Sequence, residues 1–348
     1  MKTHLIAFVL IILITGINCK KDKPEYESSP PSAEKKWVVT TIAGDGTAAF
    51  ENGAALSAKF KTPQDVVVAA DGAIYVTDAD NHRIRKIKDG QVSTFAGSDS
   101  GFVNGNGASA KFGYPYSIAL DVKENFYVSD YDDGRIRKIS SGGDVTTYDV
   151  GFPEWPPFFI AIQGMVTDTL GNIFVADTYN QRIRKVSASR QVSTIAGNDS
   201  AGFRNGNGAA AKFNYPSGII MDKEGNLYVP DPYNFRIRKI TPAGEVSTFA
   251  GSGEFGDKDG DAGTAQFRFP VDIVIDSLEN LYVADDSRIR KITPQGIVST
   301  IAGSTIGFKD GDGASAKFSV PSGLGIDAQG NIYVADTFNN RIRKISFE

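Results

Sequence analysis

The phrase Arg-Ile-Arg-Lys occurs six times along the 348-residue chain, at intervals of 47 to 54 residues. Its copies begin at Arg83, Arg135, Arg182, Arg236, Arg288 and Arg341. A second phrase, Val-Ser-Thr-x-Ala-Gly, follows four of them, at Val92, Val192, Val246 and Val298. Self-similarity with a period of about fifty residues restricts the chain to solenoids, propellers and arrays of repeated units.

One unit, residues 217–251, indicates which of these architectures to expect. Short runs of β-branched and aromatic residues alternate with turn sequences such as Lys-Glu-Gly and Pro-Ala-Gly. Runs of this kind, separated by turns, predict four short antiparallel strands in each unit. Such four-stranded units, repeated around an axis, form the blades of a β-propeller.

The phase of the repeats predicts a closed ring. Residues 38–44 resemble the fourth strand of a unit but have no three strands before them, and the last unit lacks its fourth strand. We therefore expect an all-β, six-bladed propeller over residues 37–348, in which residues 38–44 pair with residues 341–345. Such closure leaves no exposed sheet edge.

The pattern Gly-Asn-x-Tyr-Val-Ala-Asp-x-x-Asn-x-Arg-Ile-Arg-Lys-Ile, as at residues 330–345 and with small changes at 171–186, resembles the NHL repeat. The resemblance covers nearly everything after residue 36. It implies a six-bladed propeller that binds a ligand. It does not fix the function, since the family includes RNA-binding, protein-binding, adhesive and enzymatic members.

The first 18 residues are predicted to be a signal peptide, with Lys2 before an apolar run from Leu5 to Ile14. Cys19, the only cysteine, stands where a bacterial lipoprotein carries its lipid, although Gly16 replaces the usual leucine. The alternative is a plain secretory signal with an incidental thiol. Residues 19–36 are polar and contain proline, which predicts a disordered tether. We expect an extracytoplasmic protein, lipid-anchored to a bacterial envelope membrane, with the outer membrane or cell surface as candidate places.

An aspartate precedes each copy of Arg-Ile-Arg-Lys, separated from it by four residues in five blades and by two in the fifth. This spacing predicts a cross-strand pair over a hairpin. The expected pairs are Asp78–Arg83, Asp130–Arg135, Asp177–Arg182, Asp231–Arg236, Asp285–Arg288 and Asp336–Arg341. Six equally spaced copies indicate a structural role, because a functional site needs only one constellation.

A second module, ending in Ala-Lys-Phe in most copies, precedes most blades. We expect its phenylalanines to be plugs between blades: Phe60, Phe112, Phe213, Phe267 and Phe318. Residues 257–263 resemble the start of a calcium loop but lack its glycine and its final glutamate, so a solvated acidic loop is favoured. Before the third blade the module is missing, and Trp155 stands in the shorter connection.

Candidate ligand-binding residues are those that differ between copies, on the face carrying the long connections. They are Trp155, Tyr116 after a blade proline, and Tyr179, Tyr233 and Phe338 at turn tips. Aromatic rings here suit stacking on a sugar or peptide. The alternative for Trp155 is that it fills the space of the missing phenylalanine.

Two carboxylates, Asp65 and Asp272, are predicted at the mouth of the central channel and are candidate ligands for calcium or another divalent cation. Apart from such a cation, we expect no cofactor. Beyond the signal segment the chain has one histidine, His82, and no nucleophile elbow or phosphate loop.

The leading hypothesis is a non-enzymatic scaffold that binds a protein or glycan partner. The alternative is a metal-assisted, lactonase-like hydrolase or lyase acting at the channel mouth. We expect a monomer that contacts the membrane only through its lipid. The net charge of −4 argues against nucleic-acid binding, which needs a basic surface.

Overall fold

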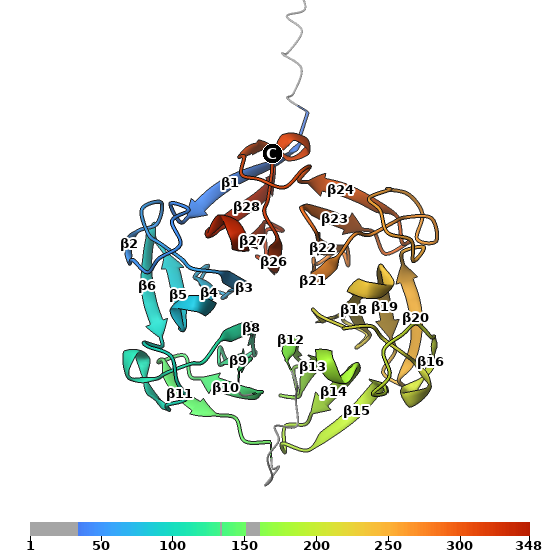
Figure 1. Cartoon of the computed structure of the whole chain (residues 1–348), viewed down its shortest axis with the longest axis horizontal. Helices are drawn as coiled ribbons and strands as arrows, with labels where there is room; N and C mark the ends of the chain where they lie inside the picture. The colour runs from blue at the N-terminus through green and yellow to red at the C-terminus, as the bar shows by residue number, and fades with distance from the viewer. Residues whose placement is uncertain (1–33, 133, 151–160) are drawn as a thin grey trace, which may run out of the picture. The chain divides into compact units, whose positions relative to one another are not determined.

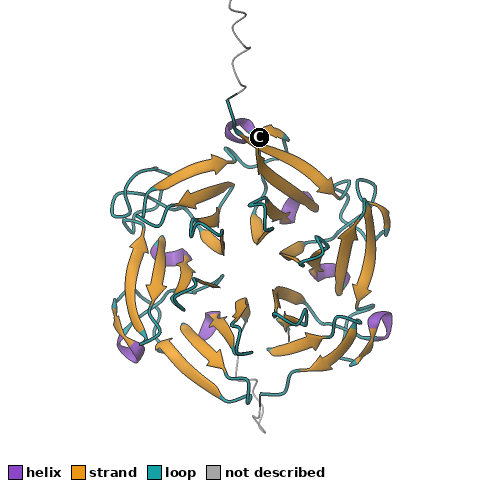
Figure 2. Cartoon of the chain, turned by 180° about the vertical axis from the view of Figure 1, so that it is seen from behind, coloured by secondary structure: helices purple, strands orange, loops and turns teal. Residues whose placement is uncertain are grey.

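A computed structural model describes residues 34–132, 134–150 and 161–348. From Lys36 to Glu348 the chain is one compact unit, a ring of six antiparallel sheets around a central channel (Figure 1). The first strand of each blade lies beside the channel and the fourth lies at the rim; Figure 2 shows the same ring from behind. The predicted all-β, six-bladed propeller is confirmed.

Four main strands make up each blade. In blades 1 to 3 they are β3 (Pro63–Val68), β4 (Ile74–Asp78), β5 (Arg83–Lys88) and β6 (Gln91–Ala96); β8 (Pro115–Leu120), β9 (Phe126–Asp130), β10 (Arg135–Ile139) and β11 (Asp144–Thr147); and β12 (Ile162–Thr167), β13 (Ile173–Asp177), β14 (Arg182–Val186) and β15 (Val192–Gly197). In blades 4 to 6 they are β17 (Ile220–Met221), β18 (Leu227–Asp231), β19 (Arg236–Ile240) and β20 (Glu245–Ala250); β21 (Pro270–Ile275), β22 (Leu281–Asp285), β23 (Arg288–Ile292) and β24 (Val298–Ala302); and β26 (Pro321–Ile326), β27 (Ile332–Asp336), β28 (Arg341–Phe347) and β1 (Trp37–Ala43).

Short elements occupy the connections. Between second and third strands lie the 3-10 turns η1 (Ala79–Asn81), η3 (Thr178–Asn180), η5 (Pro232–Asn234) and η7 (Thr337–Asn339). The long connections contain η2 (Gly107–Ser109), η4 (Gly208–Ala210) and η6 (Gly313–Ser315). Four of them also add a two-residue fifth strand, which the four-stranded prediction did not include: β2 (Gly53–Ala54), β7 (Gly105–Asn106), β16 (Gly206–Asn207) and β25 (Gly311–Asp312). These strands form because the connection passes along the outer strand of the blade it enters.

The ring closes as predicted. β1 pairs antiparallel with β28, from Trp37 opposite Phe347 to Ala43 opposite Ile342. The rings of Trp37 and Phe347 lie 5.0 Å apart between centroids. The face of the ring that carries the 3-10 turns η1, η3, η5 and η7 is here named the turn face, and the opposite face is named the underside. The fourth strand of each blade runs toward the turn face. Because Trp37 begins such a strand, it lies on the underside. There it lines a cavity with Leu278 and Gln329, from first-to-second-strand turns.

The module phenylalanines are plugs between blades, as predicted. Phe60, Phe112, Phe213, Phe267 and Phe318 all have 0% exposure. Phe60, for example, packs in one cluster with Val76 of blade 1 and Ala335 of blade 6. Burying such a side chain contributes about 1.5–3 kcal/mol, so the module fastens each blade that it precedes to the blade before it.

The predicted aspartate–arginine pairs are correct in backbone register but not as ion pairs. The backbone register is confirmed, with Asp78 opposite Arg83 and the same pairing in the other five blades. The buried ion pair, however, is formed by the second arginine of each phrase, at nitrogen–oxygen distances from 2.5 to 3.4 Å. The observed pairs are Asp78–Arg85, Asp130–Arg137, Asp177–Arg184, Asp231–Arg238, Asp285–Arg290 and Asp336–Arg343.

As ion pairs, the expected couples were therefore wrong: Asp78–Arg83, Asp130–Arg135, Asp177–Arg182, Asp231–Arg236, Asp285–Arg288 and Asp336–Arg341. Side chains two positions apart point to the same face of a strand, so both arginines lie on the side of the aspartate. The first arginine stands at the hairpin end, where Arg236 lies over the ring of Phe203 at 3.9 Å. The second is deeper and reaches back to the carboxylate.

The module also forms a cradle for the second arginine. In blade 4, Arg238 donates to Asp231 at 2.7 Å and to the backbone carbonyl of Lys212 at 3.0 Å. It also donates to the side-chain oxygen of Asn205 at 2.8 Å. In blades 1, 2, 5 and 6 the side-chain acceptors are Asn52, Asn104, Asp259 and Asp310. The carboxylate of Asp259, in the loop that resembles a calcium site, thus binds an arginine.

Candidate functional site

A row of seven aromatic rings, here named the aromatic arc, crosses the turn face from blade 2 to blade 5. Its members are Tyr114, Tyr116, Tyr131, Tyr179, Tyr215, Tyr233 and Phe269. Tyr179 and Tyr233 are 49% and 52% exposed and Phe269 is 39% exposed. The other four rings are half-buried.

Each residue of the arc contacts the next, through its ring or its hydroxyl. In blade 2, Tyr116 stacks on Tyr131 with 5.6 Å between centroids, and Tyr114 lies against both. The hydroxyl of Tyr131 donates to that of Tyr179, 3.4 Å away. From there the centroid spacings are 5.3 Å to Tyr215, 5.1 Å onward to Tyr233 and 5.3 Å to Phe269.

Four positions of the blade supply these rings. Tyr114, Tyr215 and Phe269 immediately precede a blade proline, and Tyr116 follows one. Tyr131, Tyr179 and Tyr233 lie in the turns between second and third strands. Because every blade places these positions on the turn face, aromatic residues in successive blades meet.

The arc includes three of the predicted ligand-binding residues: Tyr116, Tyr179 and Tyr233. Phe338 is exposed on η7 of blade 6, outside the arc. Trp155 lies outside the described residues. The sequence prediction missed Tyr114, Tyr131, Tyr215 and Phe269, three of which share the position before the blade proline.

The three phenols that blade 2 contributes to the arc are held in their neutral form. Burial and the nearby carboxylates of Asp80 and Asp132 raise the pKa of Tyr114. Burial also raises the pKa of Tyr116 and of Tyr131. These hydroxyls therefore remain able to donate as well as accept hydrogen bonds.

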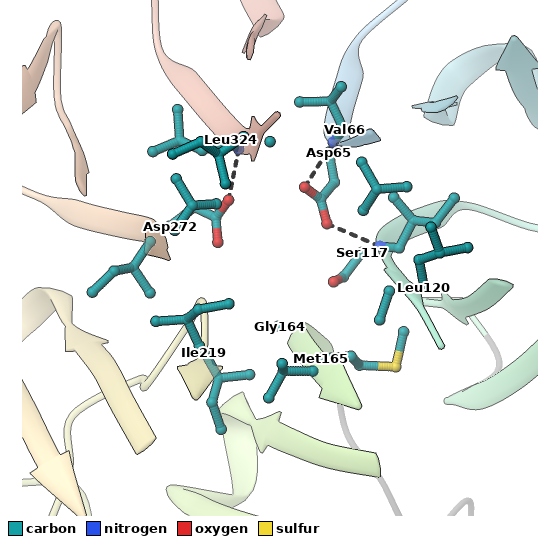
Figure 3. A pocket seen from close by; sticks show the side chains of 18 of the residues that line it. Asp65, Val66, Ser117, Leu120, Gly164, Met165, Ile219, Asp272 and Leu324 are labelled. Atoms are coloured by element: carbon teal, nitrogen blue, oxygen red, sulfur yellow. Dashed lines mark hydrogen bonds between the residues drawn. The ribbon is translucent and has the colours of Figure 1, made fainter. Parts of the chain in front are cut away.

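Asp65 and Asp272 lie in the channel, as predicted (Figure 3). The described lining encloses about 220 Å³ and consists mainly of apolar side chains from the first strands of the blades. Asp65 accepts hydrogen bonds from the backbone N–H groups of Val66, at 2.7 Å, and Ile118, at 2.9 Å. Asp272 accepts from the N–H of Leu324 at 2.7 Å. Each carboxylate thus joins its own blade to the next one.

The two channel carboxylates raise each other's cost of ionisation. Burial raises the pKa of Asp65 from 3.8 to about 6. Burial and the negative charge of Asp65 raise the pKa of Asp272 well above its ordinary value. Within the described part of the chain, no group of three or more histidine, cysteine or acidic residues is placed to hold a metal ion.

Replacing Asp272 with asparagine is expected to stabilise the ring at neutral pH. Asp65 has a folded-state pKa above 3.8, so folding favours its protonated form. The stability that this form contributes is complete below pH 3.8 and is lost as the pH rises through about 6. Asp272→Asn keeps an acceptor for Leu324 and removes the repulsion. We expect a gain on the order of 1–3 kcal/mol at pH 7 and a smaller loss of stability between acid and neutral pH, measured by urea unfolding. Asp132→Asn, at an exposed carboxylate, is the control; equal pH profiles for wild type and Asp272→Asn would contradict the expectation.

The family described as NHL repeat matches residues 60–87 and 318–345. The chain contains NHL repeats. Both matches run from a plug phenylalanine to the isoleucine after Arg-Ile-Arg-Lys, so the NHL unit comprises the plug, the first two strands and the third strand.

Known proteins resemble this chain in sequence or in fold. The chain is 28% identical over 288 residues to the protein SUPPRESSOR OF QUENCHING 1, chloroplastic, of Arabidopsis thaliana; the match covers 73% of the chain and only 27% of that longer relative. A structural genomics protein of unknown function from Bacteroides thetaiotaomicron has a TM-score of 0.73 at 22% identity. An auxiliary nutrient binding protein from the same organism has a TM-score of 0.70 at 18% identity. Each structural match covers 90% of this chain and 77% of the other, and at these identities it shows the fold alone.

Proposed function

We propose that the chain is an extracytoplasmic, lipid-anchored NHL propeller that acts as a non-enzymatic scaffold and binds a protein or glycan partner on the aromatic arc. The observation that carries this proposal is the unbroken series of contacts among seven aromatic residues of four blades on one face. A continuous aromatic surface that remains partly exposed is typical of a binding site.

The blade itself does not require these rings. In blade 1 the residue before the proline is Thr62 and the turn carries Asp80, yet β3 and β4 pair as in the other blades. In blade 6 the residue before the proline is Val320. Aromatic side chains at these positions therefore serve something other than the fold. The description of the Bacteroides neighbour as an auxiliary nutrient binding protein supports a binding role.

The lactonase-like alternative is less well supported. It needs several oxygen ligands converging on one cation. The two carboxylates of the described channel lining are occupied by backbone N–H groups of their own and the next blade. His82, whose ring contacts the Gly113 carbonyl at 2.5 Å, lies between blades 1 and 2. Among the described residues, no third acidic residue, histidine or cysteine joins Asp65 and Asp272 in a group that could hold a metal ion. No helix in the described residues has the length and apolar character to cross a membrane.

The test uses the full-length chain in detergent, applied to glycan and peptide arrays. A Tyr179→Ala, Tyr233→Ala double variant is expected to lose its array ligand by at least about tenfold, or 1.4 kcal/mol, with an unchanged melting temperature. The control is Leu170→Ala, at a 77% exposed residue between β12 and β13 on the underside. In cells, Cys19→Ala is expected to move the protein from the membrane to the soluble extracytoplasmic fraction. Array ligands bound equally by the double variant would refute the arc as the site, and unchanged membrane retention would refute the anchor.

A further inference from the structure

We infer that the partner bound by the aromatic arc is a neutral, linear oligosaccharide that lies along the arc, over the turns of blades 2 to 5. This inference rests on the function proposed above and specifies the ligand class. Three properties of the arc support it: its extended shape, its hydroxyl groups and its distribution of charge.

The shape of the arc fits a ligand made of rings joined in a line. Tyr179 and Tyr233 occupy equivalent turn positions in adjacent blades, with Tyr215 between them. The planes of Tyr179 and Tyr215 are 86° apart, and those of Tyr233 and Phe269 are 88° apart. The arc is therefore a series of separate ring surfaces rather than one flat slab or a single deep pocket. Successive sugar units can each contact one of these surfaces.

The chemistry of the arc matches sugars, which combine an apolar ring face with hydroxyl groups. Six of the seven rings are tyrosines, which pair an apolar ring with a polar tip. The raised pKa of Tyr114, of Tyr116 and of Tyr131 keeps these hydroxyls protonated. Tyr114 accepts from the side-chain amide of Gln64 at 2.9 Å and Tyr131 donates to Tyr179. A phenol can both donate and accept, so the Tyr114 hydroxyl can still donate to a sugar hydroxyl and the Tyr131 hydroxyl can still accept from one.

The charges beside the arc favour a neutral ligand. At its centre, η3 with Gln181 and η5 with Phe235 contain no charged residue. At the Phe269 end, the guanidinium of Arg268 is paired with Asp257 at 3.1 Å and lies 3.9 Å from Asp286. At the Tyr114 end stand the carboxylates of Asp80 and Asp132. An anionic polymer would meet the negative charge of these two acids, whereas a neutral one would not.

A proline-rich peptide is the strongest competing occupant, because such peptides also bind aromatic grooves. Proline has no backbone N–H, so a proline-rich segment has few donors to offer Asp80 and Asp132. Each sugar unit carries several hydroxyl donors. Those two carboxylates, at the Tyr114 end of the arc, can therefore accept hydrogen bonds from the end of the sugar chain.

The experiment titrates the full-length chain calorimetrically with defined probes. The neutral probes are cello-, xylo-, manno- and malto-oligosaccharides from one to six units; the others are oligogalacturonates and a proline-rich peptide. We expect affinity for at least one neutral series to rise with chain length. We expect Tyr233→Ala to weaken that binding at least about tenfold, which is 1.4 kcal/mol. Leu170→Ala is expected to bind as the wild type does.

The possible outcomes separate this inference from the proposed function. Tyr233-dependent binding of the peptide or oligogalacturonate, without binding of neutral sugars, would overturn the neutral glycan and leave the arc as a binding site. A neutral monosaccharide bound as tightly as its hexamer would overturn the linear arrangement. If no probe shows binding that depends on Tyr233, both the inference and the proposed site fail.

Discussion

Arg238→Ala is expected to lower the free energy of unfolding by about 3–5 kcal/mol, the cost of breaking one side of a buried ion pair. Both Arg238 and Asp231 have 0% exposure. Burial raises the pKa of Asp231 even with Arg238 beside it. Without the guanidinium, the carboxylate keeps the N–H groups of Asn214 and Asn234 as donors but has lost its counter-charge. The cradle carbonyls of Lys212 and Arg204 also lose their donor.

The matched control lies two residues away in the same strand. Arg236 is half-buried, lies over the ring of Phe203 and donates to the carbonyls of Asn234 and Ser252. Because water can replace those bonds, Arg236→Ala is expected to cost only on the order of 1–2 kcal/mol. Urea unfolding monitored by circular dichroism measures both variants. Equal losses, or a larger loss for Arg236→Ala, would show that the first arginine is the structural one.

Removing the closing strand is expected to abolish folding of the monomeric ring. A chain that begins at Asp45 lacks all of β1, including Val39 and Ala43, both 0% exposed. It leaves β28 as an unpaired edge, and such edges promote association between chains. The lost strand also removes its side of the cluster around Phe318. With total stabilities of about 5–15 kcal/mol for a domain, this loss is large enough to unfold the ring.

The control for this deletion is a chain that begins at Lys36 and retains β1. It is expected to elute as a folded monomer in size-exclusion chromatography and to unfold cooperatively. The chain that begins at Asp45 is expected to be unfolded or aggregated. If the shorter chain stays monomeric and melts within a few degrees of the longer one, pairing of β1 with β28 is not what holds the ring closed.

The sequence was sufficient for the fold because its repeats encode spacing. Six copies of one phrase gave the number of blades, and the unpartnered strand at residues 38–44 gave the closure. It was insufficient for the ion pairs. The spacing between Asp78 and Arg83 sets the backbone register, but a long side chain such as Arg85 can reach back along the strand from a deeper position. Register alone therefore did not identify the partner.

The site was predicted only in part, for a conformational reason. A residue before proline usually has an extended backbone. Reasoning from the sequence pattern therefore gives its side chain the direction expected in an extended strand. Tyr215 instead has a φ of 58°, in the left-handed region. Its ring lies between those of Tyr179 and Tyr233. The arc also depends on contacts between blades, which follow from ring closure and not from any one repeat.

The position of Trp37 places the entry of the chain into the ring on the face opposite the aromatic arc. The chain enters β1 on the underside, beside Leu278 and Gln329, whereas the aromatic arc lies on the turn face. An attachment upstream of Trp37 therefore pulls on the side remote from the arc. An attachment to a surface through this entry point does not itself occupy the turn face. A long polymer could then be captured at any point along its length, without threading a free end between the ring and the surface.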